Sequence, residues 1–267
     1  MGYHRANEVI MTLRRALPLM LLSFTIGCEE ASMVVDGLDG AFDPGTLDSD
    51  GDGTLDLDEE AAGTDPNNAD SDADGWDDTA ELNGFTDPLN AEDHPYTGGW
   101  PIGSCRDELQ GSVLQEGEIA PQFELTDMYG DTVRLHDFCH MAVLVVTGAA
   151  WCGPCQAYRA DAAAFYESYY PKGLMIIDLL GETTSGGEPA QADLESWADG
   201  HPYAVVADPG WAVTNQGYAN GGIPAVSLIA PGGQAVIVNG YPQASDIEKV
   251  LPEGFVLPEA APEAEPE

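Results

Sequence analysis

Basic side chains are scarce in this sequence, and their scarcity limits what the protein can bind. The chain has 267 residues, with 8 Lys and Arg against 47 Asp and Glu, and its formal net charge is −39. No Lys or Arg lies between Arg15 and Arg106, whereas residues 36–93 contain 20 acidic side chains. Nucleic-acid phosphates need clustered Lys and Arg, so this balance excludes DNA and RNA as partners. An acidic excess of this size is typical of a cation-binding protein, of a strongly solvated surface, or of both.

The apolar run near the N-terminus is short. It covers Ala16–Ile26, eleven residues that follow two arginines, and it is too short for a helix that spans a bilayer. It leads into Thr25-Ile26-Gly27-Cys28, which resembles a bacterial lipobox except that Thr25 stands where Leu is usual. The resemblance implies a signal peptide over residues 1–27 and a lipid on Cys28. The mature protein would then lie in the cell envelope, outside the cytoplasm and anchored to a membrane. Secretion without lipid and a retained signal anchor are the alternatives.

Cysteine is also rare, and an odd number is present. The five cysteines are Cys28, Cys105, Cys139, Cys152 and Cys155. Cys152 and Cys155 form the single C-x-x-C pair, and no second pair or Cys/His couple has the spacing of a zinc site. We therefore favour a redox-active dithiol, with a structural disulfide or half of a metal site as the alternatives.

The pair stands between a predicted buried strand and a predicted helix. Ala142–Val146 is apolar throughout, and the segment Gln156–Tyr170 after the pair reads as a helix. The free amide groups and the dipole at a helix N-terminus favour an anion, so they lower the pKa of a cysteine placed there. Cys152 would then supply the thiolate that attacks a disulfide, with Cys155 one helical turn away. Pro154 near the first turn removes no helical hydrogen bond.

The stretch Trp151-Cys152-Gly153-Pro154-Cys155 matches the thioredoxin active site, so the chain resembles thioredoxin-fold thiol-disulfide oxidoreductases. Gly117–Leu125 resembles the opening of the membrane-anchored and peroxiredoxin-like branch of that superfamily, and Gly222–Ala225 resembles its cis-proline loop. The resemblance covers about residues 112–252. It implies an α/β thioredoxin fold, with a central mixed sheet flanked by helices.

The resemblance also implies roles for individual residues. Cys152 is expected to attack the substrate disulfide, and Cys155 to resolve the mixed disulfide that forms. Pro224 is expected to be cis, which exposes the backbone of Ile223 to an extended substrate segment; an ordinary trans proline is the alternative. Trp151 is expected to present an apolar rim to partners, or else to pack in the core.

Two positions depart from the related families. Thioredoxin has a buried Asp six residues before its first active-site Cys, and this chain has Val146 there. Asp178, on the next predicted strand, is a candidate for the same proton transfer, although we expect it to face solvent near a strand end. Peroxiredoxins need Thr or Ser three residues before the reactive Cys, and Ala149 stands there, which disfavours a peroxidase.

The acidic region repeats with a period of 22 residues, as Asp43-Pro44, Asp65-Pro66 and Asp87-Pro88 show. Two units carry Asp, Asp, Asp, Gly, Asp and Glu at positions 1, 3, 5, 6, 9 and 12 of a twelve-residue loop, which is the calcium-loop pattern. Position 7 would contribute a backbone carbonyl. The predicted ligands are Asp48, Asp50, Asp52, Thr54, Asp56 and Glu59 in the first loop, and Asp70, Asp72, Asp74, Trp76, Asp78 and Glu81 in the second.

These units resemble thrombospondin type 3 repeats, in which calcium replaces a hydrophobic core. Paired EF-hands are less suitable, because Gly63–Pro66 and Phe85–Pro88 stop helices beside the loops. Calcium is thus expected as a structural cofactor, with no organic cofactor. A third copy around Glu92 is truncated and is not expected to bind metal alone. A disordered acidic linker and a calcium-sensing switch are the alternatives.

The remaining cysteines are assigned by subtraction. With Cys28 lipidated and the C-x-x-C pair joined, Cys105 and Cys139 are left in an oxidising compartment. A structural disulfide between them requires Cα atoms within about 7 Å. Two unpaired thiols or a second exchange-active pair are the alternatives.

The sequence thus divides into six parts and a series of short elements. The parts are a signal peptide (1–27), a tether (28–47), calcium-binding repeats (48–93), a linker (94–111), a thioredoxin-like domain (112–252) and a disordered acidic tail (253–267). The other predicted elements are a hairpin of Phe123–Leu125 with Thr132–Leu135, strands Leu174–Leu180 and Ala204–Ala207, a helix Gln191–Asp199, a hairpin of Ala225–Ile229 with Ala235–Asn239, and a helix Asp246–Leu251 capped by Ser245.

The function expected from these features is that of an extracytoplasmic, lipid-anchored thiol-disulfide oxidoreductase on a calcium-stabilised spacer. Its partners would be a protein disulfide or dithiol substrate and a membrane or periplasmic electron donor. The alternatives are a non-enzymatic calcium-binding surface protein on a thioredoxin scaffold and a peroxiredoxin-like peroxidase; a copper-delivery protein would need a longer Cys spacing and a partner His. Gly153-Pro154 between the cysteines favours a reductant, although oxidation and isomerisation share the motif.

Overall fold

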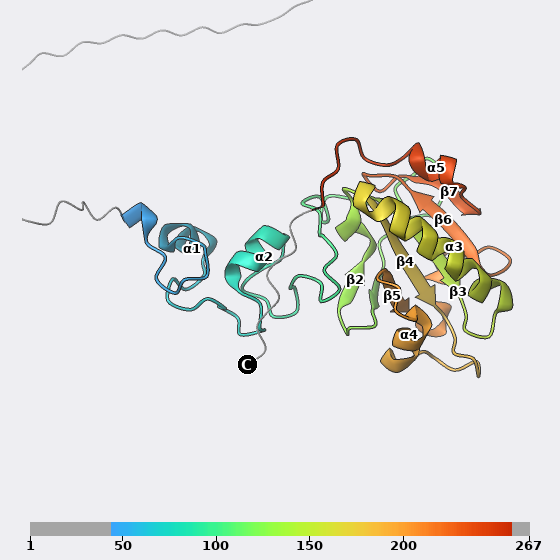
Figure 1. Cartoon of the computed structure of the whole chain (residues 1–267), viewed down its shortest axis with the longest axis horizontal. Helices are drawn as coiled ribbons and strands as arrows, with labels where there is room; N and C mark the ends of the chain where they lie inside the picture. The colour runs from blue at the N-terminus through green and yellow to red at the C-terminus, as the bar shows by residue number, and fades with distance from the viewer. Residues whose placement is uncertain (1–43, 258–267) are drawn as a thin grey trace, which may run out of the picture. The chain divides into compact units, whose positions relative to one another are not determined.

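A computed structural model describes residues 44–257 of the chain (Figure 1). The expectations for the signal peptide, Cys28 and the last ten residues lie outside the described residues. The helices are α1 Asp56–Ala62, α2 Asp78–Gly84, α3 Gly153–Tyr169, α4 Gln191–Ala198 and α5 Ala244–Glu248. The strands are β1 Glu124–Thr126, β2 Thr132–Arg134, β3 Ala142–Gly148, β4 Leu174–Leu180, β5 Ala204–Ala207, β6 Ala225–Ile229 and β7 Ala235–Gly240.

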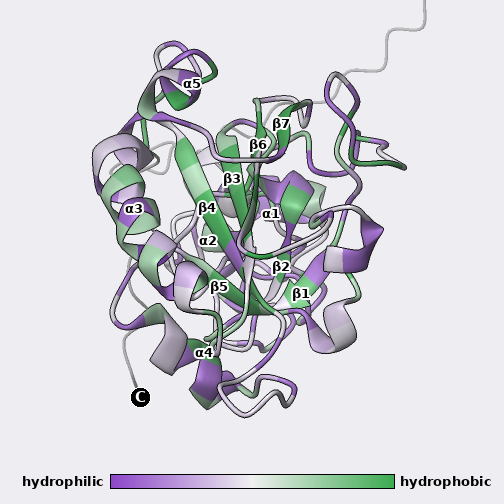
Figure 2. Cartoon of the chain, turned by 90° about the vertical axis from the view of Figure 1, so that its right-hand side faces the viewer, coloured by the Kyte–Doolittle hydropathy of each residue, from purple (hydrophilic) through white to green (hydrophobic). Residues whose placement is uncertain are grey.

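Five strands form the central sheet in the order β5-β4-β3-β6-β7. β3, β4 and β5 run parallel, while β6 and β7 run antiparallel to their neighbours. Every residue of β3 and β4 is buried, which explains their continuous apolar sequences. Figure 2 shows these hydrophobic strands in the interior with α3 beside them. The mixed sheet flanked by helices confirms the expected thioredoxin fold.

The predicted strands and long helices lie within a few residues of the observed ones. One small element differs: α5 begins at Ala244 after Gln243, so Ser245 is inside the helix and is not its N-cap. The acidic repeats differ more from the prediction, in which no helix flanked the loops. The last residues of each twelve-residue loop begin a two-turn helix, α1 or α2. Acidic side chains in the first turn favour these helices, and residues in the left-handed conformation, Gly63 and Phe85, end them.

The segment expected to be a linker, residues 94–111, packs against the thioredoxin fold. Tyr96, Trp100 and Ile102 are buried in the same hydrophobic cluster as the central sheet. Cys105 and Cys139 form a disulfide whose Cα atoms lie 6.1 Å apart, within the limit set above. The segment is therefore held both by packing and by a covalent bond.

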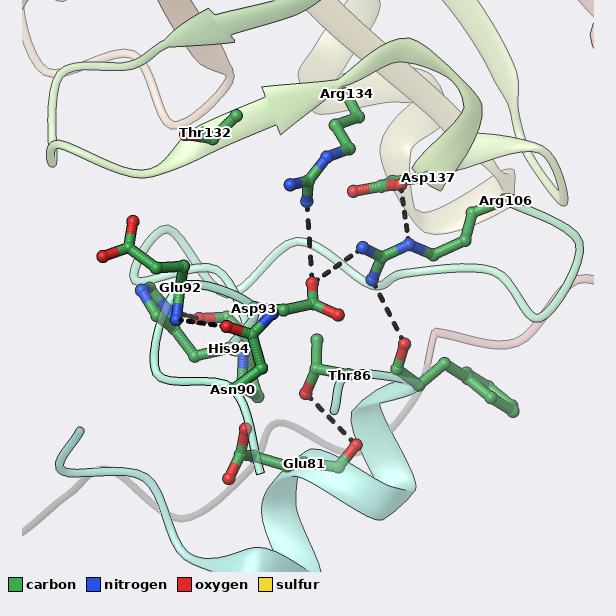
Figure 3. Close-up of polar contacts among 12 residues, drawn as sticks. Glu81, Thr86, Asn90, Glu92, Asp93, His94, Arg106, Thr132, Arg134 and Asp137 are labelled. Carbon is green, nitrogen blue, oxygen red and sulfur yellow. Dashed lines mark hydrogen bonds and ion pairs between the residues drawn. The ribbon is translucent and has the colours of Figure 1, made fainter. Parts of the chain in front are cut away.

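Arg106, the first basic residue after the repeats, joins the repeat segment to the domain (Figure 3). Its guanidinium lies 2.7 Å from Asp93 and 3.3 Å from the buried Asp137. It also donates a hydrogen bond to the carbonyl of Phe85, the residue that ends α2, at 3.2 Å. Arg134 approaches the same Asp93 oxygen at 3.6 Å. Two of the few basic side chains are thus used where the acidic repeats meet the thioredoxin fold.

Within residues 44–257, the structure contains no helix with the length and apolar character needed to cross a membrane.

Candidate functional site

The C-x-x-C pair lies where the central strand passes into α3. β3 ends at Gly148, and Cys152 is the N-cap residue of the helix. The Sγ of Cys152 accepts a hydrogen bond from the backbone N–H of Cys155 at 3.1 Å. When Cys152 is a thiolate, this amide and the helix dipole stabilise its charge, as the sequence predicts. Pro154 falls in the first helical turn, where no intrahelical hydrogen bond is lost.

The two sulfur atoms are joined in a disulfide of 2.08 Å, with Cα atoms 5.2 Å apart. Gly148 makes the close fit of Cys155 against the central strand feasible. A Cβ at position 148 would lie 3.2 Å from the Cβ of Cys155 and 3.3 Å from its Sγ. Both cysteines are almost fully buried in this oxidised state.

The loop before β6 faces the pair. The Ile223–Pro224 peptide is cis. The carbonyl oxygen of Ile223 lies 3.8 Å from the Sγ of Cys152, within reach of a reduced thiol as donor. Tyr241 supports the loop by donating its hydroxyl to the carbonyl of Pro224 at 3.1 Å. The cis-proline loop is therefore placed against the sulfur that is expected to react.

Trp151 does not pack in the core, because 51% of its surface is exposed. Its indole N–H donates to the carboxylate of Glu182 at 2.6 Å. A groove of about 480 Å³ lies between α3 and the segment after β7. It is lined by Pro154, Ala157, Tyr158, Asp161, Phe165, Pro224, Tyr241, Pro242 and Gln243. The exposed side chains of Trp151, Pro154 and Tyr241 are thus available to a substrate near the disulfide.

The expectation that Asp178 faces solvent is wrong. Asp178 lies in the middle of β4, is 2% exposed, and accepts a hydrogen bond from the indole of Trp197 at 2.9 Å. It is the register partner of Val146, so it lies one strand away from the position of the acid in thioredoxin. The continuous apolar run of β4 is the pattern of a strand covered on both faces, so an Asp within that run is buried with its neighbours.

A cation lies near this buried acid. Arg159 of α3 is stacked over the ring of Trp197, 4.5 Å from its centroid. Burial raises the pKa of Asp178 to about 6, although the Trp197 hydrogen bond and the Arg159 charge oppose the rise. Arg159 follows Cys155 by four residues, one helical turn. A role for Asp178 in proton transfer stays a prediction.

The two acidic loops share one arrangement of their aspartates. One oxygen of each carboxylate at positions 1, 3 and 5 accepts a backbone N–H of its own loop, at 2.7 to 3.2 Å. The three carboxylates of each loop place oxygen atoms within 4.8 Å of one another. The first group is Asp48, Asp50 and Asp52, and the second is Asp70, Asp72 and Asp74. Oxygen atoms gathered in this way suit a hard cation.

The glutamates at position 12 supply the clearest sign of a cation site. Glu59 and Glu81 are fully buried, and neither carboxylate has a hydrogen-bond partner for either oxygen. Buried carboxylates without partners are costly. Burial, followed by repulsion from neighbouring carboxylates, raises the pKa of Glu59 to about 7 and that of Glu81 to about 8. A bound divalent cation would satisfy these oxygens, so the donor set fits calcium.

The predicted ligands at position 9 have another task in the structure. Asp56 accepts two hydrogen bonds from Ser49, at 2.8 Å each, and Asp78 accepts two from Ser71, at 2.9 and 2.8 Å. These contacts close each loop across its ends, so direct ligation by position 9 would compete with them. The sequence pattern did not distinguish this closing role from ligation. Serine at position 2 of both loops was the available signal.

The comparisons with known proteins concern the domain that carries the cysteines. Residues 117–234 match the AhpC/TSA family. Thiol-disulfide oxidoreductase ResA of Geobacillus kaustophilus is 30% identical over 143 residues, covering 52% of this chain and 78% of that protein. ResA of Geobacillus thermodenitrificans is 29% identical with the same coverage. Among solved structures, the thioredoxin domain of a thiol-disulfide oxidoreductase from Bacteroides vulgatus covers 52% of this chain and 96% of its own, with 22% identity and a TM-score of 0.42.

Proposed function

Because the chain belongs to the family of thiol-disulfide oxidoreductases that includes the ResA proteins, we propose that its Cys152–Cys155 pair exchanges disulfides with protein substrates outside the cytoplasm. The observation that carries the proposal is the position of Cys152. Its sulfur lies at the N-terminus of α3, accepts an amide N–H, and borders the cis-proline loop. This environment stabilises the thiolate that disulfide exchange requires.

Gly153-Pro154 between the cysteines favours the reducing direction, which proceeds in two displacements. The Cys152 thiolate attacks one sulfur of a substrate disulfide, and the other substrate sulfur leaves as a thiolate. Cys155 then loses its proton and attacks the Sγ of Cys152, which releases the second substrate thiolate. Two electrons pass from the enzyme dithiol to the substrate, and the enzyme ends as the observed disulfide. An electron donor in the membrane or the periplasm must return two electrons before the next turnover.

The substrate would be an extended segment of a protein. The backbone of Ile223, held beside Cys152 by cis Pro224, would pair with such a segment as an added strand. Side chains on either side of the substrate cysteine would contact the exposed Trp151 and the groove bordered by Tyr241. These contacts would place the substrate sulfur on line with the Cys152 Sγ.

An insulin-reduction assay with dithiothreitol tests this function. The wild type should accelerate precipitation of the insulin B chain, Cys152→Ser should abolish turnover, and Cys155→Ser should accumulate mixed disulfides with substrate. A wild type that gives no acceleration would favour the non-enzymatic alternative. Rapid consumption of hydrogen peroxide would favour the peroxidase alternative, against the expectation from Ala149. Equilibration with glutathione then measures the redox potential and so decides the direction.

We also propose that calcium is a structural cofactor of residues 48–93. The unpartnered buried oxygens of Glu59 and Glu81 support this assignment. An oxygen of Glu59 lies within 4.8 Å of carboxylate oxygens of Asp52 and Asp78, and Glu81 is repelled by the charges of Asp74 and Asp72. Calcium would join the two ends of each loop and offset the repulsion among their carboxylates, so that binding energy becomes folding energy. The repeats would then act as a stiffened spacer between the catalytic domain and a lipid on Cys28. Metabolic labelling with a fatty acid, lost in Cys28→Ala, tests the anchor.

A further inference from the structure

One carboxylate holds two tryptophan side chains beside the active site. Glu182 follows β4 by two residues, at the edge of the sheet where β3 delivers the cysteines. Its Oε2 accepts the indole N–H of Trp151 at 2.6 Å, and its Oε1 accepts that of Trp211 at 3.2 Å. Its main-chain carbonyl also accepts the N–H of Ala150 at 2.8 Å. Glu182 is thus tied to the active-site loop through both its side chain and its backbone.

The indole of Trp211 holds the carboxylate of Glu182 in a fixed position. The ring of Trp211 lies over Gly181, where an added Cβ would be only 2.4 Å from the Trp211 Cε3 atom. Trp211 also has a left-handed backbone, with φ of 58°. The ring of Trp211 is held in place by its packing over Gly181. Its indole N–H therefore fixes one oxygen of Glu182, and the other oxygen accepts the N–H of Trp151.

The indole of Trp151 needs a hydrogen-bond partner to hold its orientation. Trp151 directly precedes Cys152, and half of its surface is exposed, so packing alone does not restrict its rotamers. Ordering a free side chain when a protein binds has a cost in conformational entropy. A charge-assisted hydrogen bond to a fixed carboxylate removes that cost before the substrate arrives.

We propose that Glu182 is a positioning residue for disulfide exchange, which holds the Trp151 indole beside Cys152 in the orientation that receives a polypeptide substrate. The inference rests on the proposed function. The proposal distinguishes two classes of substrate. A polypeptide must contact the indole of Trp151, whereas a small aliphatic disulfide reaches the Cys152 sulfur without that contact. Loss of Glu182 should therefore affect protein substrates selectively, and mainly through KM.

The experiment compares Glu182→Ala and Glu182→Gln with the wild type and with Glu195→Gln, an exposed α4 position that matches the change in charge. With insulin, kcat/KM of Glu182→Ala should fall about five-fold, the effect of ordering one side chain, with kcat nearly unchanged. With hydroxyethyl disulfide, kcat/KM of Glu182→Ala should stay at the wild-type value. Glu182→Gln should recover part of the loss, because its amide oxygen accepts the Trp151 N–H. Glu195→Gln should match the wild type on both substrates.

The indole N–H signals in a nitrogen-15 correlation spectrum report the contact directly, assigned with Trp151→Phe and Trp211→Phe. Both signals should shift in Glu182→Ala and remain unshifted in Glu195→Gln. Equal losses on insulin and on hydroxyethyl disulfide would overturn the positioning role, since they indicate a general effect on Cys152 or on stability. Unchanged insulin kinetics in Glu182→Ala would overturn it as well. Absence of insulin turnover in the wild type contradicts instead the proposed function itself.

Discussion

The disulfide between Cys105 and Cys139 should contribute a large share of the stability of the catalytic domain. The two residues are 34 apart in sequence, so the bond closes a loop of about 35 residues. Closing such a loop removes about 13 cal/mol/K of chain entropy from the unfolded state, or about 4 kcal/mol at 25 °C, in the entropic account of disulfides. Since a domain has a net stability of about 5 to 15 kcal/mol, this is a substantial fraction.

Urea unfolding of Cys105→Ala, Cys139→Ala and the double variant measures the contribution, with calcium held constant and the active-site pair oxidised. With an m value of about 2 kcal/mol/M, the midpoint should fall by about 2 M in each variant. The three losses should be equal, because either substitution removes the same cross-link. A loss below about 1 kcal/mol in the double variant would refute the reasoning. Packing of Tyr96, Trp100 and Ile102 would then hold the segment without the bond.

Two further predictions concern carboxylates that are buried in the structure. Calorimetry should find two calcium ions per wild-type chain and one in Glu59→Gln. The control Glu60→Gln, a change at an exposed neighbouring residue, should still bind two. Equal stoichiometry in all three proteins would contradict the assignment of Glu59 as a ligand. The pKa of Asp178 is raised to about 6 in the folded state, whereas an Asp in the unfolded chain has a pKa of about 4. Between these two pH values the folded state therefore keeps a proton that the unfolded state has lost. Stability should therefore fall as pH rises from about 4 to about 6, by at most about 1.4 kcal/mol per pH unit from this group. Asp178→Asn should flatten that slope in urea unfolding at constant calcium, and a slope as steep as in the wild type would show that other groups cause it.

The sequence predicted the redox centre because all its determinants are local. A continuous apolar strand, a C-x-x-C pair and a helix follow one another within residues 142–170, and each has a pattern that short-range rules interpret. The strands of the central sheet were predicted for the same reason, with bounds that differ from the observed ones by at most two residues. The assignment of Glu59 and Glu81 as calcium ligands, made from spacing alone, stays a prediction. Local sequence could not show that they end up buried without hydrogen-bond partners.

Contacts between residues far apart in sequence could not be predicted in this way. The continuous apolar run around Asp178 indicates a strand covered on both faces, but it does not reveal that Trp197, 19 residues away, donates a hydrogen bond to the buried carboxylate. Segment 94–111 looked like a linker because its apolar residues are too few for a periodic pattern, yet they join a core built by later residues. Glu182 carried no signal at all, since its partners Trp151 and Trp211 lie about 30 residues away on either side.

The sequence by itself therefore determined the position of the cysteine pair between a buried strand and a helix, the repeat that gathers acidic oxygens, and the order of the elements. Tertiary structure alone decided which side chains surround the cysteine pair and the acidic loops. It buried Asp178 beside Trp197, set Arg106 between the repeats and the domain, and brought Glu182 to the active-site tryptophan. The physical reason is that backbone conformation follows from neighbouring residues, whereas burial and side-chain partners depend on how distant segments pack together.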